Sequence, residues 1–570
     1  MIGEVPEKTK YVIAKKQPFS ESYLWEIQQA YFIGKGVGAW RSGQVPHYVS
    51  SNPRLANSYA EMVIALWQDQ QRLAFNKPSN EPIYLIELGV GSGRFAFHFL
   101  QRLTQLCQQA DIPRENFCYV LTDVAEQNLA FLGQHPRFRP FFASGLLDLA
   151  LFDVSHSTQL HLQKRDHVLA IGSCTKPMVI IANYLFDSIP QELFYIDKGQ
   201  IAQCWVSLYA DADPKQLDKM ELLGHVHCDY EYQPLAQLPY PEEPYLQKLL
   251  TEYQQTLTDT HVLLPVTGLR CLQRLQDLSK SGLLLLTADK GYHQINHLSG
   301  QPLPKLVTHT GCFSLNVNYH ALKRICEQSG GVALFPPQLH NHVNIGGLLL
   351  LKEAPRYRQT IGAYERHVAE FGPDAFYSIT KHARQNIAAM STRDILAYMQ
   401  LSFADAHLFA FYLPRLIELV SEFEPHEWET VRAMVDKVWQ NYYSIGEERD
   451  LASGIGHLFF MMGDFAGCLA YLDNSLAQYG RQVYTLLNMA LCQLKLDNEA
   501  AAEALLREAH ECDPDHPIVQ RLLAKYDADM AAAIVESLTK PSVKSPPLLI
   551  PLQDTAVSPP PDLVFRPGAY

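Results

Sequence analysis

A short apolar run that ends in an acid and three alternating glycines constrains the fold of this chain more than any other stretch. Residues 83–87 (IYLIE) are followed by Gly89, Gly91 and Gly93, and a helical pattern begins at Arg94. Buried strand, tight turn and helix in this order are typical of a parallel sheet covered by helices. Glycines let the backbone turn sharply and approach a ligand closely, so the turn predicts a ligand site. An ordinary strand–helix turn is the alternative.

The spacing of the glycines indicates the kind of ligand. A dinucleotide site has the pattern G-x-G-x-x-G around a pyrophosphate, but here the third glycine comes one position early and Glu87 precedes the first. An acid suits a cationic ligand, and S-adenosylmethionine carries a sulfonium and an ammonium. Asp123 ends the next predicted strand, 118–122, where a carboxylate can accept both ribose hydroxyls; a helix N-cap is its alternative role. We therefore expect S-adenosylmethionine as the cofactor, bound by Glu87, Gly89, Gly91, Gly93 and Asp123.

The rest of the first 355 residues alternates short apolar runs with helical patterns. Seven runs are candidate strands: 83–87, 118–122, 141–143, 178–182, 283–287, 332–335 and 347–352. The stretches 94–109, 126–132 and 321–328 have helical periodicity. The pattern predicts an α/β fold with a mostly parallel seven-stranded sheet of Rossmann-like type. The polar, tyrosine- and proline-rich stretch near 205–260 is predicted to be an insertion.

Beyond residue 355 the pattern is helical, and a repeat is detectable. Three pairs of turn or small residues are 34 positions apart: Gly463 with Asp497, Cys468 with Ala502, and Ser475 with Ala509. This period and these residues resemble tetratricopeptide repeats, which stack helix pairs. The sequence thus predicts four parts: a helical region over 1–78 that completes the site, a cofactor-binding domain over 79–355, an all-α repeat domain over 356–538, and a proline-rich disordered tail over 539–570.

Composition indicates which kinds of binding partner and which cellular compartment to expect. Lys and Arg number 47 against 60 Asp and Glu, a net charge of −13, which argues against nucleic acid because such binding needs Lys and Arg on the phosphates. Apolar runs are far shorter than the ~20 residues that span a bilayer, so no membrane association is expected. The 11 cysteines are scattered without CxxC spacing, which favours reduced thiols in the cytoplasm. The pairs His225/His227 and His340/His342 lack a third ligand, so no metal is predicted.

Several stretches carry a family resemblance. They are Ile181–Pro190 (IANYLFDSIP), Ser51–Pro53 with Tyr59–Glu61, Ala288–Tyr292 (ADKGY) and Phe313–Asn318. Together with the glycine turn they resemble class I S-adenosylmethionine-dependent methyltransferases. More narrowly, they are similar to the MidA-like family, which includes a mitochondrial complex I assembly factor that is a protein arginine methyltransferase. The resemblance covers roughly residues 20–352.

The resemblance implies roles for three further residues. Asn183 falls where class I enzymes place a residue beside the transferring methyl, although it could instead cap a helix over 184–189. Asp187 is expected to orient the acceptor or act as a base, with a structural role as the alternative. Asp148 could reach the adenine amino group, although a surface carboxylate is the other interpretation. The family's Asn-Glu pair is Asn183-Tyr184 here. Arginine recognition benefits from carboxylates, which Asp187, Glu192 or Glu61 could supply.

The sequence favours a methyltransferase that acts on a protein side chain, with a nitrogen acceptor such as arginine, and binds a protein or peptide through its repeats. A scaffold that keeps the fold without transfer is the second hypothesis. A small-molecule methyltransferase is the third, and a nicotinamide oxidoreductase is a distant fourth because the glycine spacing is wrong for it. Neither the oligomeric state nor the identity of the acceptor is predicted.

Overall fold

The computed structural model describes residues 11–41, 45, 48–73, 80–309, 311–337 and 343–526. The chain divides into two compact units, Met1–Ile379 and Thr380–Tyr570, which are described separately. The predicted tail 539–570 and the pair His340/His342 lie outside the described residues. Among the described residues, no helix has the length and apolar character needed to cross a membrane.

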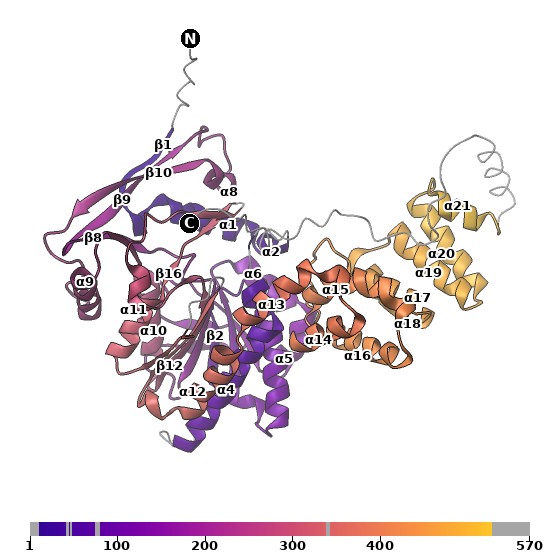
Figure 1. The fold of residues 1–570 in the computed structure, drawn as a ribbon, viewed down its shortest axis with the longest axis horizontal. Helices are drawn as coiled ribbons and strands as arrows, with labels where there is room; N and C mark the ends of the chain where they lie inside the picture. The colour runs from indigo at the N-terminus through magenta and orange to yellow at the C-terminus, as the bar shows by residue number, and fades with distance from the viewer. Residues whose placement is uncertain are drawn as a thin grey trace, which may run out of the picture. The chain divides into compact units, whose positions relative to one another are not determined.

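The first unit is built on a seven-stranded sheet (Figure 1). Its strand order is β17-β18-β12-β7-β2-β3-β4. The strands are β2 (Ile83–Glu87), β3 (Phe117–Asp123), β4 (Leu147–Leu151), β7 (Met178–Asn183), β12 (Gly282–Asp289), β17 (Val332–Leu334) and β18 (Asn344–Leu351). Four neighbouring pairs, from β12 to β4, are parallel, while β18 is antiparallel to both β12 and β17. The sheet expected to be mostly parallel is therefore a mixed one.

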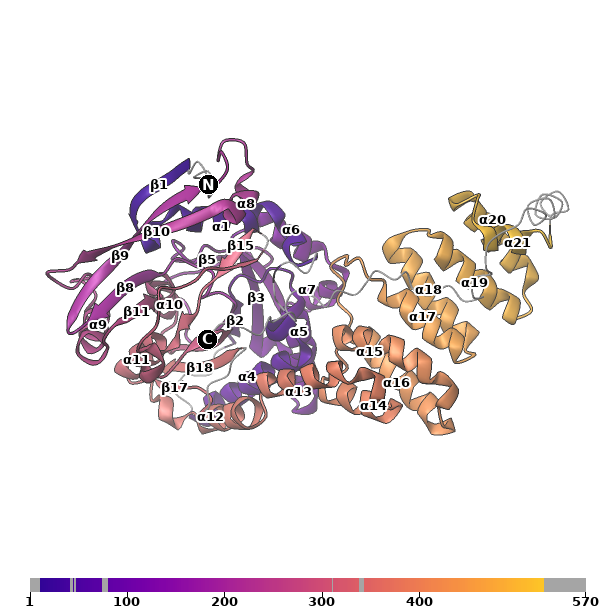
Figure 2. The ribbon, with the colours of Figure 1, turned by 45° about the horizontal axis from the view of Figure 1, so that its top comes forward.

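Helices cover both faces of this sheet because its central strands are apolar on both sides. On one face lie α10 (Val266–Leu278) and α11 (Tyr319–Gln328) (Figure 2). They share one buried apolar cluster with β7 and β12, to which α9 (Pro244–Thr256), packed on α11, also contributes. On the other face, α4 (Pro53–Leu73) packs along α5 (Arg94–Gln109), and α12 (Arg358–Tyr364) packs on α4. The helix predicted over 94–109 has those bounds in the structure.

One predicted strand is wrong. Residues 141–143 belong to the short helix α7 (Arg139–Ala143), and the strand follows as β4. Pro140 lies in the first turn of α7, where its fixed φ favours a helix. The aromatic pair Phe141-Phe142 suggested a strand, but proline at this position carries the stronger local signal.

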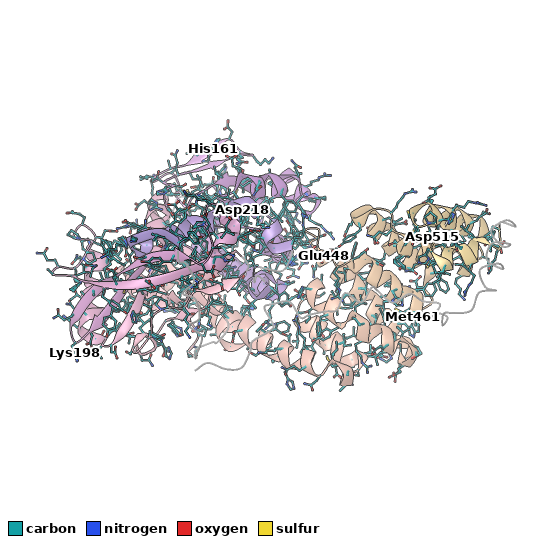
Figure 3. The ribbon with its side chains drawn as sticks, turned by 90° about the horizontal axis from the view of Figure 1, so that it is seen from above. His161, Lys198, Asp218, Glu448, Met461 and Asp515 are labelled. Atoms are coloured by element: carbon teal, nitrogen blue, oxygen red, sulfur yellow. The ribbon has the colours of Figure 1, made fainter. Side chains whose placement is uncertain are left out.

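A second, five-stranded antiparallel sheet was not predicted. It contains β1 (Tyr11–Pro18), β8 (Glu192–Asp197), β9 (Gln200–Ala210), β10 (Val226–Pro234) and β11 (Thr260–Leu264). The stretch predicted as an insertion near 205–260 thus holds most of β9, all of β10 and α9. Lys198 lies at the turn between β8 and β9, at the outer end of this sheet (Figure 3), with its side chain 86% exposed.

The second unit is helical throughout its described part. Its main helices are α14 (Thr392–Leu401), α15 (Ala406–Leu419), α16 (Pro425–Asn441), α17 (Leu451–Met461), α18 (Phe465–Tyr479), α19 (Val483–Lys495), α20 (Glu499–Cys512) and α21 (Pro517–Leu523). The 34-residue period has a physical basis here. Gly463 and Asp497 both adopt a positive φ, of 72° and 57°, in equivalent turns, and Cys468 and Ala502 are both buried in the helices that follow.

Candidate functional site

Four neighbouring strands end in a polar residue at the same edge of the main sheet. Glu87 ends β2, Asp123 ends β3, Asn183 ends β7 and Asp289 ends β12. These strands are parallel neighbours, so their carboxyl ends meet at one edge. In open α/β sheets, ligands bind outside the carboxyl ends of the strands. This edge is the candidate site.

The glycine turn after β2 has the backbone that its residue types require. Gly89, Gly91 and Gly93 have φ values of 65°, 55° and 80°, in the left-handed region that favours glycine. Gly93 precedes the first turn of α5. The turn is tied to β3, because the N–H of Val90 donates to the carbonyl oxygen of Thr122 over 2.8 Å. The glycine turn therefore lies next to the carboxyl end of β3.

Asp123 is bound to this turn directly. The N–H of Gly91 donates to its Oδ2 over 3.0 Å, and the N–H of Ala125 donates to its Oδ1 over 2.9 Å. Burial raises the pKa of Asp123, while the hydrogen bonds from Ala125, Asn128 and Gly91 act against that rise. A carboxylate has about four lone-pair positions, and four donors, the Val124 N–H included, already act on this one, so a ribose hydroxyl would share or replace one of them.

Glu87 is a buried acid with an unusual proton affinity. The hydroxyl of Tyr119 donates to its Oε2 over 2.8 Å. Burial raises the pKa of Glu87 to about 8, the Tyr119 hydrogen bond opposes the rise, and the charge of Asp123 adds to it. A positive charge nearby would favour ionised Glu87. The environment of Glu87 therefore suits a cationic ligand better than an anionic one.

Asp148 lies inside β4 rather than at its end, and it is buried. Its Oδ1 accepts the N–H of Lys164 over 2.8 Å, and its Oδ2 accepts the N–H of Arg165 over 3.1 Å. The Arg165 side chain approaches Oδ2 to 3.8 Å. These contacts favour a structural role. The surface carboxylate that was the alternative expectation is wrong, because the side chain is not exposed.

Asn183 is fixed by two helices on the α4 side of the sheet. The hydroxyl of Tyr59 donates to its Oδ1 over 3.0 Å, and its Nδ2 lies 3.4 Å from the carbonyl oxygen of Ser50 in α3 (Tyr48–Ser51). The helix expected over 184–189 is absent, because these residues form a turn. Asn183 therefore does not cap a helix there.

The turn after β7 carries Asp187. Tyr184 begins it with a φ of 50°, which is uncommon for a bulky residue. The hydroxyl of Ser188 donates to Oδ1 of Asp187 over 2.6 Å, and burial raises the pKa of this carboxyl to about 6. The other two acids proposed as replacements are engaged elsewhere: Glu61 pairs with Arg102 at 2.9 Å, and Glu192 accepts the hydroxyl of Ser20 over 2.7 Å.

Two features of the site were missed in the sequence. Asp289 is buried completely beside the turn that carries Asp187. Trp40, in α2 (Gly38–Arg41), lies against the glycine turn, because a Cβ at Gly91 would be 2.7 Å from its Cζ2. Phe32 stacks on Trp40 with ring centroids 5.9 Å apart. No local pattern signals either contact, since both join segments distant in the chain.

His225 and His227, one of the two histidine pairs noted in the sequence, share a single acidic neighbour. His225 and His227 both approach the carboxylate of Asp211, at 2.7 and 3.8 Å. Within the described ranges there is no cluster of three or more His, Cys, Asp or Glu side chains arranged to hold a metal ion.

Comparison with known families finds two regions of similarity. Residues 59–319 match the model of a family described as "Putative S-adenosyl-L-methionine-dependent methyltransferase". The prediction of S-adenosylmethionine as the cofactor is confirmed by this match. Residues 459–526 match the tetratricopeptide repeat, which confirms the repeat predicted from the 34-residue period. The chain thus carries a region similar to putative S-adenosylmethionine-dependent methyltransferases and, further along, one similar to tetratricopeptide repeats. A search of curated proteins finds no match.

Three solved structures are similar to parts of the chain. One is an uncharacterized protein of Burkholderia thailandensis, 12% identical, covering 60% of this chain and 90% of its own, with a TM-score of 0.37. Another is a "likely methyl transferase" of the same organism bound to S-adenosyl-homocysteine, 13% identical, covering 63% and 85%, also with a TM-score of 0.37. The third is the CurJ carbon methyltransferase, 11% identical, covering 52% and 54%, with a TM-score of 0.24. At these TM-scores we draw nothing about this chain from them.

Proposed function

We propose that this protein transfers a methyl group from S-adenosylmethionine to a nitrogen of a protein side chain, and that its helical repeats hold the protein partner. The observation that carries the proposal is the edge of the main sheet, where a glycine turn and the acids Glu87 and Asp123 lie beside Asn183 and the turn that bears Asp187.

The residues present fit the methyl donor. Ribose hydroxyls would bind Asp123 by sharing or replacing its present donors. A ligand can approach the backbone at Gly89, because the nearest side-chain atom to a Cβ placed there belongs to Leu185, 3.4 Å away. A positive charge placed beside Glu87 would favour its ionised form, which would then balance that charge. When bound, S-adenosylmethionine supplies a methyl group activated by its sulfonium.

The acceptor end of the site is formed by Asn183 and Asp187. Methyl transfer is a direct displacement that needs the two reactants held in line. The amide of Asn183 is oriented by Tyr59, and we assign it the role of orienting the acceptor nitrogen. Asp187 is the first carboxylate after β7 in the sequence, and we assign it the role of proton acceptor.

The repeats support a macromolecular acceptor. Stacked helix pairs form extended concave surfaces that bind peptides or proteins, and the match covers residues 459–526. The narrower proposal, an arginine acceptor as in the MidA-like family, rests on the resemblance of residues 20–352. Tyr184 in place of the family's glutamate weakens it, so a primary amine is an equal alternative.

A scaffold without transfer is the second candidate, and Trp40 is the observation that favours it. Its indole occupies the space over Gly91, which a donor bound close to the turn would need. In the methyltransferase proposal this ring moves aside or lies beside the donor.

The deciding experiment is transfer of radiolabel from S-adenosylmethionine in an extract of cells that lack this protein. Addition of the full chain should label protein, and Asp123→Asn should label it at least about tenfold less, since hydrogen bonds to a charged group are worth ~1.5–3 kcal/mol. Label in low-mass material instead would indicate a small-molecule methyltransferase. A partner captured by the repeats without any label would support the scaffold.

A further inference from the structure

Two buried acids meet where β7 and β12 end. Asp187 lies in the turn after β7, and Asp289 is the last residue of β12, the neighbouring parallel strand. The charge of Asp187 raises the pKa of Asp289, so the two carboxyls are close enough to interact. Asp187 is 6% exposed and Asp289 is 0% exposed. Two carboxylates that share a buried site do not both ionise readily.

The hydrogen bonds of the two acids differ. Asp187 accepts the Ser188 hydroxyl over 2.6 Å, which stabilises its ionised form. Across the described residues, no hydrogen bond of ordinary geometry reaches either oxygen of Asp289. The N–H groups of Leu185 and Phe186 and the hydroxyl of Tyr319 face Asp289 and oppose the rise of its pKa, but none of them makes a hydrogen bond of ordinary geometry with it. An ionised carboxylate in this position would be costly, so the geometry favours a protonated Asp289.

The other titratable groups around the pair are neutral near pH 7. Tyr59 and Tyr319 interact with Asp289, and Cys312 interacts with Asp187. Burial raises the pKa of each of these three groups. No Lys or Arg is among the groups that shift the pKa of either acid. The burial of the pair is therefore not offset by a cation among the groups that shift these two pKa values.

We propose that Asp187 and Asp289 act as one acid pair that carries a single proton, held on Asp289, so that Asp187 is free to receive a proton from a nitrogen acceptor. This inference rests on the proposed methyltransferase function. The acceptor's lone pair forms the new N–C bond, the C–S bond breaks with its electron pair left on sulfur, and the extra N–H proton passes to Asp187. Because Asp289 keeps its proton, the pair carries a single negative charge, which lies on Asp187. Asp289 is therefore a positioning residue.

Infrared difference spectroscopy on the full chain at pH 7.5 tests the assignment without an acceptor. The spectrum of wild type minus Asp289→Asn should contain one protonated carboxyl group. The spectrum of wild type minus Asp187→Asn should contain one ionised carboxylate. The reverse assignment, or two ionised carboxylates, would overturn the proposal. Both variants should bind S-adenosylhomocysteine as wild type does, which shows that they are folded.

Transfer of radiolabel to extract protein tests the roles. Asp187→Asn should be at least about 100-fold slower, the lower range for loss of a general base, and its residual rate should no longer fall below pH 6. Asp289→Asn should be slowed less than Asp187→Asn, and because its amide resembles the neutral acid it should keep the fall in rate near pH 6 that reports Asp187. Equal losses in both variants would refute the division of roles. Failure of wild type to bind S-adenosylhomocysteine would refute the proposed function instead.

Discussion

The hydroxyl of Tyr59 donates a hydrogen bond of 3.0 Å to Oδ1 of Asn183. It joins α4, which covers one face of the main sheet, to the carboxyl end of a central strand. Tyr59 is fully buried and packs edge-to-face on Phe95 of α5, with ring centroids 5.5 Å apart. The orientation of Asn183 is therefore determined by the helical layer as well as by the sheet.

Replacing Tyr59 with Phe should separate orientation from packing. The Phe95 contact remains while the Asn183 amide loses its donor, so the free energy of unfolding should fall by about 0.5–1.5 kcal/mol, the net value of one hydrogen bond. Affinity for S-adenosylhomocysteine should not change, because the hydroxyl that is removed bonds to Asn183. Urea unfolding and calorimetry measure the two quantities, and a loss of donor affinity without a loss of stability would contradict this role.

Glu87 should make stability depend on pH. Its pKa is raised to about 8 from the model-peptide value of 4.5, so the folded protein holds a proton that the unfolded chain releases between these values. The contribution of Glu87 to stability is therefore greatest below pH 4.5 and is lost as the pH rises to 8. In Glu87→Gln this loss is absent, so the urea midpoint of the variant relative to wild type should be higher at pH 8 than at pH 5. If the difference between the two urea midpoints were the same at pH 5 and pH 8, Glu87 would already be ionised at pH 5, and its pKa would not be raised.

Trp40 should report donor binding. Its indole lies against Gly91, so S-adenosylhomocysteine should change the intrinsic tryptophan fluorescence of wild type. Trp40→Phe should lose most of this change. The matched control is Trp205→Phe, on β9 of the second sheet, which should keep it. A full response in Trp40→Phe would mean that the donor does not approach this ring.

Replacing Asp148 with Ala tests whether its carboxylate contacts adenine or has a structural role. Its carboxylate accepts the N–H groups of Lys164 and Arg165, so Asp148→Ala should lower the free energy of unfolding by about 1–3 kcal/mol per donor left unsatisfied. Donor affinity should stay within about twofold. Unaltered stability with at least tenfold weaker binding would instead assign Asp148 to the adenine.

The local part of the site could be predicted because each piece lies within a few residues. The strand ending at Glu87, the three glycines and α5 follow from a buried run, a turn signal and helical periodicity. Asp123 follows from the same logic at the next strand. In these places the sequence pattern and the tertiary structure agree.

The remaining features depend on contacts between distant segments. The second sheet was missed because its strands include polar outward-facing residues, as on β10, whose pattern resembles a loop-rich insertion. The Asp187–Asp289 pair joins two strands separated by more than 100 residues in the chain. The sequence around either residue does not indicate that the other is nearby, so only the order of strands in the sheet reveals the pair.

Calorimetry with S-adenosylhomocysteine tests the central claim, that the glycine turn and its acids bind the methyl donor. The informative variant is Gly91→Ala, whose Cβ would lie 2.7 Å from Trp40 at a φ of 55°. Its matched control is Gly199→Ala, at the β8–β9 turn, which has a φ of 76° and no neighbour within 4 Å. We expect wild type and Gly199→Ala to bind alike and Gly91→Ala to bind at least about tenfold more weakly, a loss of ~1.4 kcal/mol. Absence of binding by wild type, or equal binding by all three proteins, would contradict the account.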